Sequence, residues 1–275
     1  MNWWDALILG IVQGLTEFLP ISSKGHLALF QTMIPGFNQP GVLFDVWLHA
    51  ATLCAVILYF RRDLIAIARS FWPGGSTGGL AGWTAPEARW FVVLIVVATI
   101  PVGVLGIAFR KEIERTFQSV LLIGLALLIN GLILFLAARF RKGEKRIGNF
   151  RLWDALWVGL AQIAALFPGI SRSGSTISAG MFRGLRGEEA IKFSFFLSLP
   201  VILGAVLLEG LKEITRLHPE DLPAYGIGFI ASLASGLLAI SLILRIVRNN
   251  GLQWFAYYCW LVGIMVVLAK LSGWL

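Results

Sequence analysis

Charged side chains are scarce in this sequence of 275 residues, because Asp, Glu, Lys and Arg together make up only 14% of it. Soluble domains usually carry about 25% charged residues, so this scarcity excludes an ordinary soluble protein. Hydrophobic residues reach 57% of the chain, and the mean hydropathy is +0.80. These values are typical of an integral membrane protein.

Cysteine is almost absent as well. Cys54 and Cys259 are the only two, they lie far apart in the sequence, and neither belongs to a CxxC or Cys/His cluster. The sequence therefore predicts neither a disulfide framework nor a zinc site. The first 20 residues also lack a basic segment, and Asp5 and Glu17 lie around their apolar run, so we expect them to belong to the mature fold and not to a signal peptide.

Six apolar segments have about the length that a bilayer-spanning helix needs, roughly 20 residues. They are 42–60, 90–108, 119–140, 190–208, 224–244 and 254–272. The net charge of +8 does not indicate a nucleic-acid partner, because the basic residues do not gather in a soluble domain. Most of them fall in loops on one side of the predicted spans. The positive-inside rule makes that side the cytoplasm and places both termini outside.

A segment near the start of the chain is repeated. Residues 4–25 align without a gap to residues 153–174, with ten identical positions. Three predicted spans follow each copy, and this odd number of crossings inverts the second copy relative to the first. We therefore predict an all-α integral membrane protein with a single membrane domain over 1–275, built from two inverted-topology repeats at 1–140 and 152–275.

Each copy is interrupted by helix-breaking residues, Pro-Ile-Ser-Ser in the first and Pro-Gly-Ile-Ser in the second. Proline ends a helix and frees backbone polar groups. We predict that each repeat consists of one re-entrant helix-loop-helix hairpin and three transmembrane helices. The first hairpin would enter from outside and the second from the cytoplasm. Broken backbone at membrane depth must be buried in protein or line a wet cavity, so the two loops should meet.

The two interrupted segments carry polar residues that suit a phosphate group. They are Gln13, Glu17, Ser22, Ser23, Lys24 and His26 in the first, and Gly169, Ser171, Arg172, Ser173 and Thr176 in the second. A guanidinium can hold phosphate oxygens at two points, and Gly/Ser turns at a helix start present N–H groups to an anion. A carboxylate beside phosphate would be repelled, so we expect Glu17, with Gln13, to hold a divalent cation. His26 would act as general acid or base, and Ser23, Ser22 or a water molecule as the nucleophile.

These residues also have structural interpretations. Serine and glycine in membrane proteins often serve only close helix packing. Arg172 could simply pair with Glu17, and His26 could be a buried structural histidine. Asp45 and His49 begin a predicted span, and we expect them to anchor it or to pair with a neighbour.

At these two motifs the chain resembles the bacterial undecaprenyl-diphosphate phosphatase family, first known for bacitracin resistance. The family's acidic motif and the serine and histidine positions after it are matched at Gln13, Glu17, Ser22, Ser23 and His26. Its second motif, PGxSRSxxT, is matched over residues 168–176. Lys24 departs from the pattern, because many members carry Ser or Thr there. Its ammonium could hold a phosphate oxygen or pair with Glu17.

The resemblance implies a multi-pass hydrolase of the bacterial inner membrane that removes the terminal phosphate of undecaprenyl diphosphate and so recycles the carrier lipid for peptidoglycan synthesis. It also implies a divalent cation, Mg²⁺ or Ca²⁺, and an active site that faces the outer, periplasmic side. The expected partners are this substrate and membrane lipid, and a symmetric fold permits a homodimer. A polyprenyl-phosphate flippase is the alternative, because inverted repeats with broken helices are also typical of transporters.

Overall fold

The computed structural model describes residues 2–34, 43–73, 83–109, 119–140, 143–213 and 218–273. Within these ranges the chain forms helices and no β-strand, apart from one isolated bridge between Lys145 and Leu185. The all-α prediction is confirmed. Short 3-10 turns lie at Ile147–Asn149 (η1), Ala164–Leu166 (η2) and Pro219–Asp221 (η4).

Five helices are long and apolar enough to cross a membrane, and a sixth span forms if the bent pair α3 and α4 counts as one. The five are α5 (Ala85–Ala108), α7 (Val120–Phe140), α10 (Gly187–Glu213), α11 (Leu222–Arg248) and α12 (Leu252–Leu271). The bent pair consists of α3 (Leu43–Tyr59) and α4 (Arg61–Ser70), whose axes differ by 72°. Each of the six predicted spans therefore corresponds to a helix or to this pair.

Both predicted hairpins are present as helix pairs with a break. The first consists of α1 (Trp3–Phe18) and α2 (Ser23–Met33), and the second of α8 (Leu152–Ile163) with η2, then α9 (Arg172–Phe182). The second helix of each hairpin is capped by the serine at the same repeat position. Ser22 accepts a hydrogen bond from the Gly25 N–H, and Ser171 accepts one from the Gly174 N–H. Such caps satisfy backbone donors that a helix start leaves open.

The open ends of the two hairpins lie beside different elements. Near the end of α2, the Gln31 side chain donates to Asp45 at the start of α3, at 2.8 Å. In the second hairpin, Asp154 at the start of α8 pairs with Arg183, directly after α9, and with Lys145 of the preceding linker. This placement agrees with hairpins that enter from opposite sides. The inverted relation of the complete repeats stays a prediction.

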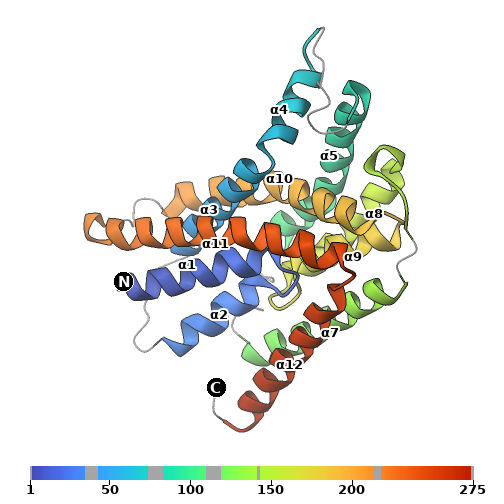
Figure 1. The fold of residues 1–275 in the computed structure, drawn as a ribbon. Helices are drawn as coiled ribbons and strands as arrows, with labels where there is room; N and C mark the ends of the chain where they lie inside the picture. The colour runs from blue at the N-terminus through green and yellow to red at the C-terminus, as the bar shows by residue number, and fades with distance from the viewer. Residues whose placement is uncertain are drawn as a thin grey trace.

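The first helix of each hairpin packs against a span of the other half of the chain, α1 against α11 and α8 against α5 (Figure 1). Gly10 and Gly159, which occupy the same repeat position, make these contacts possible. A Cβ atom at Gly10 would collide with the backbone of Gly228 in α11, and one at Gly159 would collide with the backbone of Ala98 in α5. Each half therefore positions the hairpin of the other.

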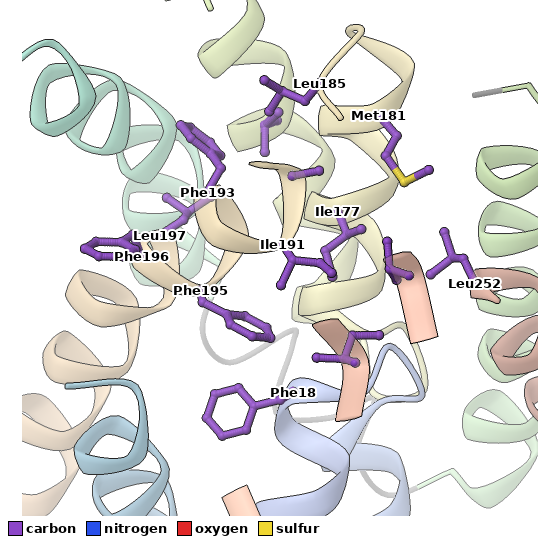
Figure 2. Packing of buried hydrophobic residues seen from close by; sticks show 14 of the residues in the cluster. Phe18, Ile177, Met181, Leu185, Ile191, Phe193, Phe195, Phe196, Leu197 and Leu252 are labelled. Carbon is purple, nitrogen blue, oxygen red and sulfur yellow. The ribbon is translucent and has the colours of Figure 1, made fainter. Parts of the chain in front are cut away.

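The main apolar core includes residues on both sides of the first break, Phe18 and Ile21. Figure 2 shows Phe18, the last residue of α1, beside Phe195 of α10, with Ile177 and Ile191 nearby. The rings of Phe18 and Phe195 meet edge to face with centroids 5.2 Å apart. Phe18 is fully buried, so this core fixes the end of α1, where Glu17 is located.

Ion pairs join the helix ends that lie near the basic loops, on the side that the sequence predicts to be the cytoplasm. Lys192 of α10 pairs with Asp63 of α4 at 2.6 Å, and Arg248 of α11 pairs with Glu188 of α10 at 2.8 Å. Together with the pairs around Asp154, these contacts place the ends of α4, α8, α10 and α11 on a common side. The identification of that side with the cytoplasm stays a prediction.

Candidate active site

The two breaks are in direct contact, as the sequence predicted. The Gly169 N–H donates to Ser22 Oγ at 3.2 Å, and the Ser173 hydroxyl donates to the carbonyl of Leu19 at 3.2 Å. Gly169 has φ of +99°, and a Cβ there would clash with the carbonyl of Ile123, so glycine is needed at this position. The broken backbone of each hairpin therefore finds hydrogen-bond partners in the other.

Asn130 of α7, which belongs to neither sequence motif, joins both breaks. Its Nδ2 donates to the carbonyl of Pro20 at 2.8 Å, and its Oδ1 accepts from the Ser171 N–H at 3.0 Å. The side chain is fully buried. A lone amide within an apolar span was the available signal, because polar residues at membrane depth need partners.

Ser22 adopts an unusual backbone conformation, with φ of 73° and ψ of 92°. A non-glycine residue in such a region costs about 1–3 kcal/mol, so its surroundings must hold it there. Its hydroxyl accepts from Gly25 and Gly169, and its carbonyl accepts from both the backbone N–H and the Nδ1 of His26. Together these four contacts hold Ser22 in place, and the two to its carbonyl fix the peptide group that leads into Ser23.

Glu17 is the electrostatic centre of the junction. Its side chain is only 5% exposed, and its Oε1 lies 2.8 Å from Nη2 of Arg172, which is 155 positions later in the chain. Its Oε2 accepts from Ser23 Oγ at 2.6 Å and from Gln13 Nε2 at 3.0 Å. A buried carboxylate needs such compensation, and here both hairpins supply it.

Ser23 and Glu17 form the contact with the clearest chemical consequence. At 2.6 Å the hydroxyl is within the distance that proton transfer requires, and its acceptor is a carboxylate. Ser23 is the first residue of α2 and is partly exposed, whereas Glu17 is buried. The carboxylate is therefore placed to accept the proton of a hydroxyl that substrate can reach.

Arg172 is oriented from two sides. Besides its contact with Glu17, its Nη1 donates to the carbonyl of Ser194 in α10 at 3.1 Å. Ser194 also meets the hydroxyl of Thr176 at 2.6 Å. The ion pair with Glu17, which is the structural interpretation of Arg172, is thus present. The Arg172 side chain remains 14% exposed, so it can still bind a phosphate.

His26 faces away from the Ser23–Glu17 pair. Its Nδ1 lies 2.9 Å from the carbonyl of Ser22, and its Nε2 lies 2.9 Å from the hydroxyl of Tyr258 in α12. Among the described residues, no hydrogen bond joins His26 to Ser23 or Glu17. The general acid or base role expected of His26 stays a prediction.

His49 of α3, which we expected to anchor a span or to pair with a neighbour, lies beside the carboxylate of Glu17. Its Nε2 is 3.6 Å from Glu17 Oε2, and its Nδ1 is 2.7 Å from the carbonyl of Asp45. The sequence contained no spacing signal for this contact, because it joins two helices.

The remaining candidates of the second segment build the loop itself. Ser171 Oγ caps α9 and lies 3.0 Å from Ser173 Oγ, while the Thr176 hydroxyl donates to the carbonyl of Arg172 at 2.8 Å. All three residues are buried. Their direct contact with substrate stays a prediction.

Lys24 marks the open side of the junction. It follows Ser23 in α2 and is exposed, and its ammonium interacts electrostatically with both Glu17 and Arg172. Two cationic side chains from different hairpins therefore lie around one carboxylate. That surplus of positive charge suits a strongly anionic ligand.

The junction offers some, but few, ligands for a hard divalent cation. Gln13 Oε1 is buried and has no hydrogen-bond partner among the described residues, although Gln13 Nε2 contacts Glu17. An amide oxygen and a carboxylate are the kinds of ligand that Mg²⁺ and Ca²⁺ bind. The described residues contain no group of three or more His, Cys, Asp and Glu placed for a metal. The chemistry of this pair fits a cation that takes its other ligands from phosphate and water.

Comparisons with known proteins agree with this geometry. The model of the family described as "Bacitracin resistance protein BacA" matches residues 6–265. The chain is 43% identical over 265 residues to the undecaprenyl-diphosphatase of Syntrophotalea carbinolica, an alignment covering 96% of this chain and 98% of that relative. It is 42% identical over 276 residues to undecaprenyl-diphosphatase 1 of Shouchella clausii, covering 98% and 96%. The undecaprenyl-diphosphatase of Methanobrevibacter smithii is 40% identical over 279 residues, with 99% of each chain covered.

Proposed function

The chain belongs to the bacitracin resistance protein BacA family and is a membrane-embedded undecaprenyl-diphosphatase; from that premise we propose that the junction of the two hairpins is its active site. The single observation that carries the proposal is the Ser23–Glu17–Arg172 series. It holds a hydroxyl 2.6 Å and a guanidinium 2.8 Å from the same buried carboxylate.

In the proposed reaction, the terminal phosphate of undecaprenyl diphosphate lies beside Ser23. The hydroxyl oxygen attacks the terminal phosphorus while its proton passes to Glu17. The bond between that phosphorus and the bridging oxygen breaks, and undecaprenyl phosphate leaves. Water then attacks the phosphoserine, the bond between phosphorus and the serine oxygen breaks, and inorganic phosphate leaves with the hydroxyl of the water. Glu17 returns its proton to the Ser23 oxygen, and the remaining proton of the water is released, so both groups regain their initial state.

The cationic groups stabilise the charge that moves during this transfer. Arg172 and Lys24 flank the carboxylate and would hold the phosphate oxygens, and such fixed electrostatic stabilisation is usually the largest catalytic contribution. Arg172 is held toward the junction by the Ser194 carbonyl, so little reorientation is needed. When bound, a divalent cation would add neutralising charge beside the phosphates, held by Gln13 and Glu17.

The other candidates support this centre. His26 holds the carbonyl of Ser22 and so the start of α2, which carries Ser23. Ser22, Gly169, Ser171, Ser173 and Thr176 shape the loops whose backbone would face the phosphates. The proposed site faces the outer side of the bacterial inner membrane, because the open end of α1 and α2 lies beside the start of α3, away from the ion-paired side. The homodimer stays a prediction.

A flippase has less support than a hydrolase. It would need groups that bind an anionic lipid head, but it would have no use for a hydroxyl held at 2.6 Å from a carboxylate. The relatives named above also carry the name of a hydrolase.

The test measures phosphate release from undecaprenyl diphosphate by purified protein in detergent. We expect Ser23→Ala and Glu17→Gln each to lower kcat by about 10²–10⁴-fold, the range that proton transfer by a positioned group contributes. Ser241→Ala, at an exposed serine of α11, is the matched control and should behave as wild type.

Two further readouts separate the alternatives. Rapid acid quenching with labelled substrate should trap phosphate on Ser23. Nearly full activity of Ser23→Ala would show that water, and not the serine hydroxyl, is the nucleophile. Folded wild-type protein that binds the lipid and moves it across vesicles without releasing phosphate would support the flippase instead.

A further inference from the structure

A hydrogen bond between the last helix of the chain and the first hairpin has no part in the reaction above. The hydroxyl of Tyr258 in α12 lies 2.9 Å from Nε2 of His26 in α2. The two rings are stacked, with centroids 5.6 Å apart and an interplanar angle of 17°. His26 is 4% exposed, so this contact is shielded from water on the histidine side.

The two partners of His26 determine its tautomer. A carbonyl oxygen can only accept, so Nδ1, at 2.9 Å from the carbonyl of Ser22, carries a proton. In the neutral imidazole Nε2 then has the lone pair, and the hydroxyl of Tyr258 donates to it. Tyr258 therefore favours the one neutral tautomer in which His26 can also donate to Ser22.

The Ser22 carbonyl matters because of the strained residue to which it belongs. Ser22 has φ of 73°, and both donors to its carbonyl come from His26, the backbone N–H at 3.1 Å and Nδ1 at 2.9 Å. This carbonyl is part of the peptide group that joins Ser22 to Ser23. Its orientation therefore helps to set where the Ser23 hydroxyl points.

The second hairpin provides an internal contrast. Ser171, the cap at the position equivalent to Ser22, has φ of −75° and is unstrained. The position equivalent to His26 is occupied by Ser175, whose buried hydroxyl has no hydrogen-bond partner among the described residues. The imidazole and its tyrosine partner thus occur only in the hairpin whose cap needs an additional restraint.

We propose that Tyr258 is a positioning residue for hydrolysis. It fixes the tautomer of His26, His26 holds the Ser22 carbonyl, and the restrained peptide keeps the Ser23 hydroxyl on Glu17. The inference rests on the proposed function of Ser23. It assigns to α12, the helix farthest along the chain from the first hairpin, a part in arranging the nucleophile.

The first experiment compares Tyr258→Phe with Tyr257→Phe. Phenylalanine at 258 keeps the ring stacking and removes the donor, so we expect kcat to fall by about five- to tenfold, as for the loss of one buried hydrogen bond. KM should stay near the wild-type value, because the proposal gives Tyr258 a role through His26 and not in substrate binding. Tyr257 packs against Trp254, Trp260 and Phe135 instead, so its variant should behave as wild type. Equal losses of kcat in both variants would overturn the proposal, because they would show that activity depends on the packing of α12 in general.

A pair of histidine variants tests whether Tyr258 acts through His26. In His26→Asn the introduced amide nitrogen can take the place of Nδ1 and donate to Ser22, whereas in His26→Gln the longer side chain carries its amide to the Nε2 position. We expect His26→Asn to keep more activity than His26→Gln. In the His26→Asn background, Tyr258→Phe should have no further effect on kcat. Fully additive effects of the two substitutions would contradict the proposal.

A spectroscopic readout does not depend on activity. The chain has only three histidines, so ¹⁵N-labelled histidine in detergent-solubilised protein gives few signals, and His26→Asn identifies the signal of His26. Wild-type His26 should be the Nδ1–H tautomer, and Tyr258→Phe should shift it toward a mixture. An Nε2–H tautomer in the wild type would overturn the proposal, even if Tyr258→Phe failed to fold. Because this signal does not require hydrolysis, it also separates failure of this proposal from failure of the serine mechanism.

Discussion

The two hairpins have closely similar sequences up to their breaks, yet only the first contains an acid at the junction. Glu17 of the first hairpin is replaced by Leu166 in the second, and Ser23 of the first is replaced by Arg172. The carboxylate and the guanidinium therefore come from different copies and meet at 2.8 Å. Divergence at these two positions makes each hairpin incomplete by itself, so the site exists only where they touch.

The caps extend the contrast to the backbone. Ser22 and Ser171 accept from the same relative donor, but Ser22 is left-handed and Ser171 is extended. Strained non-glycine residues occur preferentially at functional sites, because the surroundings must over-determine them. The strained residue, Ser22, lies in the hairpin that carries the proposed nucleophile. We infer that the strain is retained because it orients the Ser23 hydroxyl, although it lowers stability.

Removal of the charge of Glu17 from its ion pair with Arg172 should have the largest effect on stability and activity. Glu17→Gln leaves the mostly buried Arg172 without its counter-ion, and breaking such a pair costs about 3–5 kcal/mol. Phosphate release should also be lost. The double variant Glu17→Gln/Arg172→Met should recover much of the stability, measured by thermal unfolding in detergent, without recovering activity. Recovery of activity would mean that the pair is structural only.

Substitution of a glycine at the contact between the two breaks should lower the free energy of unfolding by nearly as much. Gly169→Ala introduces a Cβ at φ of +99° and against the carbonyl of Ile123, so we expect a loss of roughly 2–5 kcal/mol. Gly25→Ala, on the opposite side of the same contact, meets Gly169 only at 3.3 Å and should cost less. Gly103→Ala in α5 is the control, because its added Cβ meets no described residue outside the adjoining backbone of α5 within 4 Å. Equal unfolding temperatures for the variants at 169 and 103 would contradict this ranking.

Much of this arrangement could be predicted from the sequence. Proline and glycine after an apolar helix required breaks, and broken backbone at membrane depth required a partner, so the meeting of the two loops followed. The pairing of Glu17 with Arg172 was foreseeable for the same reason, because unpaired charges are costly in that environment. The choice of acid–base partner was not, since Ser23 turns to Glu17 and not to His26.

The residues that the sequence did not reveal are those that act between helices. Asn130, Ser194 and Tyr258 each lie in an apolar span, where they follow no periodic pattern that indicates a partner. Their contacts depend on how far each helix is rotated about its axis. That rotation is set by the packing of many side chains, such as Gly10 against α11, and no local motif encodes it.

A pH-dependent contrast separates the starts of the two hairpins. Burial alone would raise the pKa of Asp154, but hydrogen bonds from Arg183 and the Arg151 N–H, with the charges of Lys145 and Arg183, hold it below its ordinary value of 3.8. The ionised form therefore stabilises the fold. This contribution is complete above the ordinary value and is lost as the pH falls below it, through the folded-state pKa.

Asp154→Asn should accordingly lower the unfolding temperature at neutral pH and weaken its decline in acid. We expect a loss of about 1–2 kcal/mol, because Arg183 is 39% exposed and its pairing is partly screened. Asp5, the equivalent residue of the first hairpin, makes no ion pair with the described residues, so Asp5→Asn is the matched control. If the unfolding temperature of the Asp154→Asn variant fell in acid as steeply as that of the wild type, groups other than Asp154 would cause the pH dependence.

The smallest expected effect comes from the repeated glutamine. Gln13 donates to Glu17, but both side-chain atoms of its equivalent, Gln162, are buried without a hydrogen-bond partner among the described residues. Gln162→Leu removes this unsatisfied amide and should raise stability by about 1 kcal/mol with unchanged phosphate release. Gln13→Leu should instead lower activity, because it takes a donor from the proposed base. Destabilisation by Gln162→Leu would instead indicate that the Gln162 amide is hydrogen-bonded to internal water, and that the second hairpin keeps this glutamine for stability.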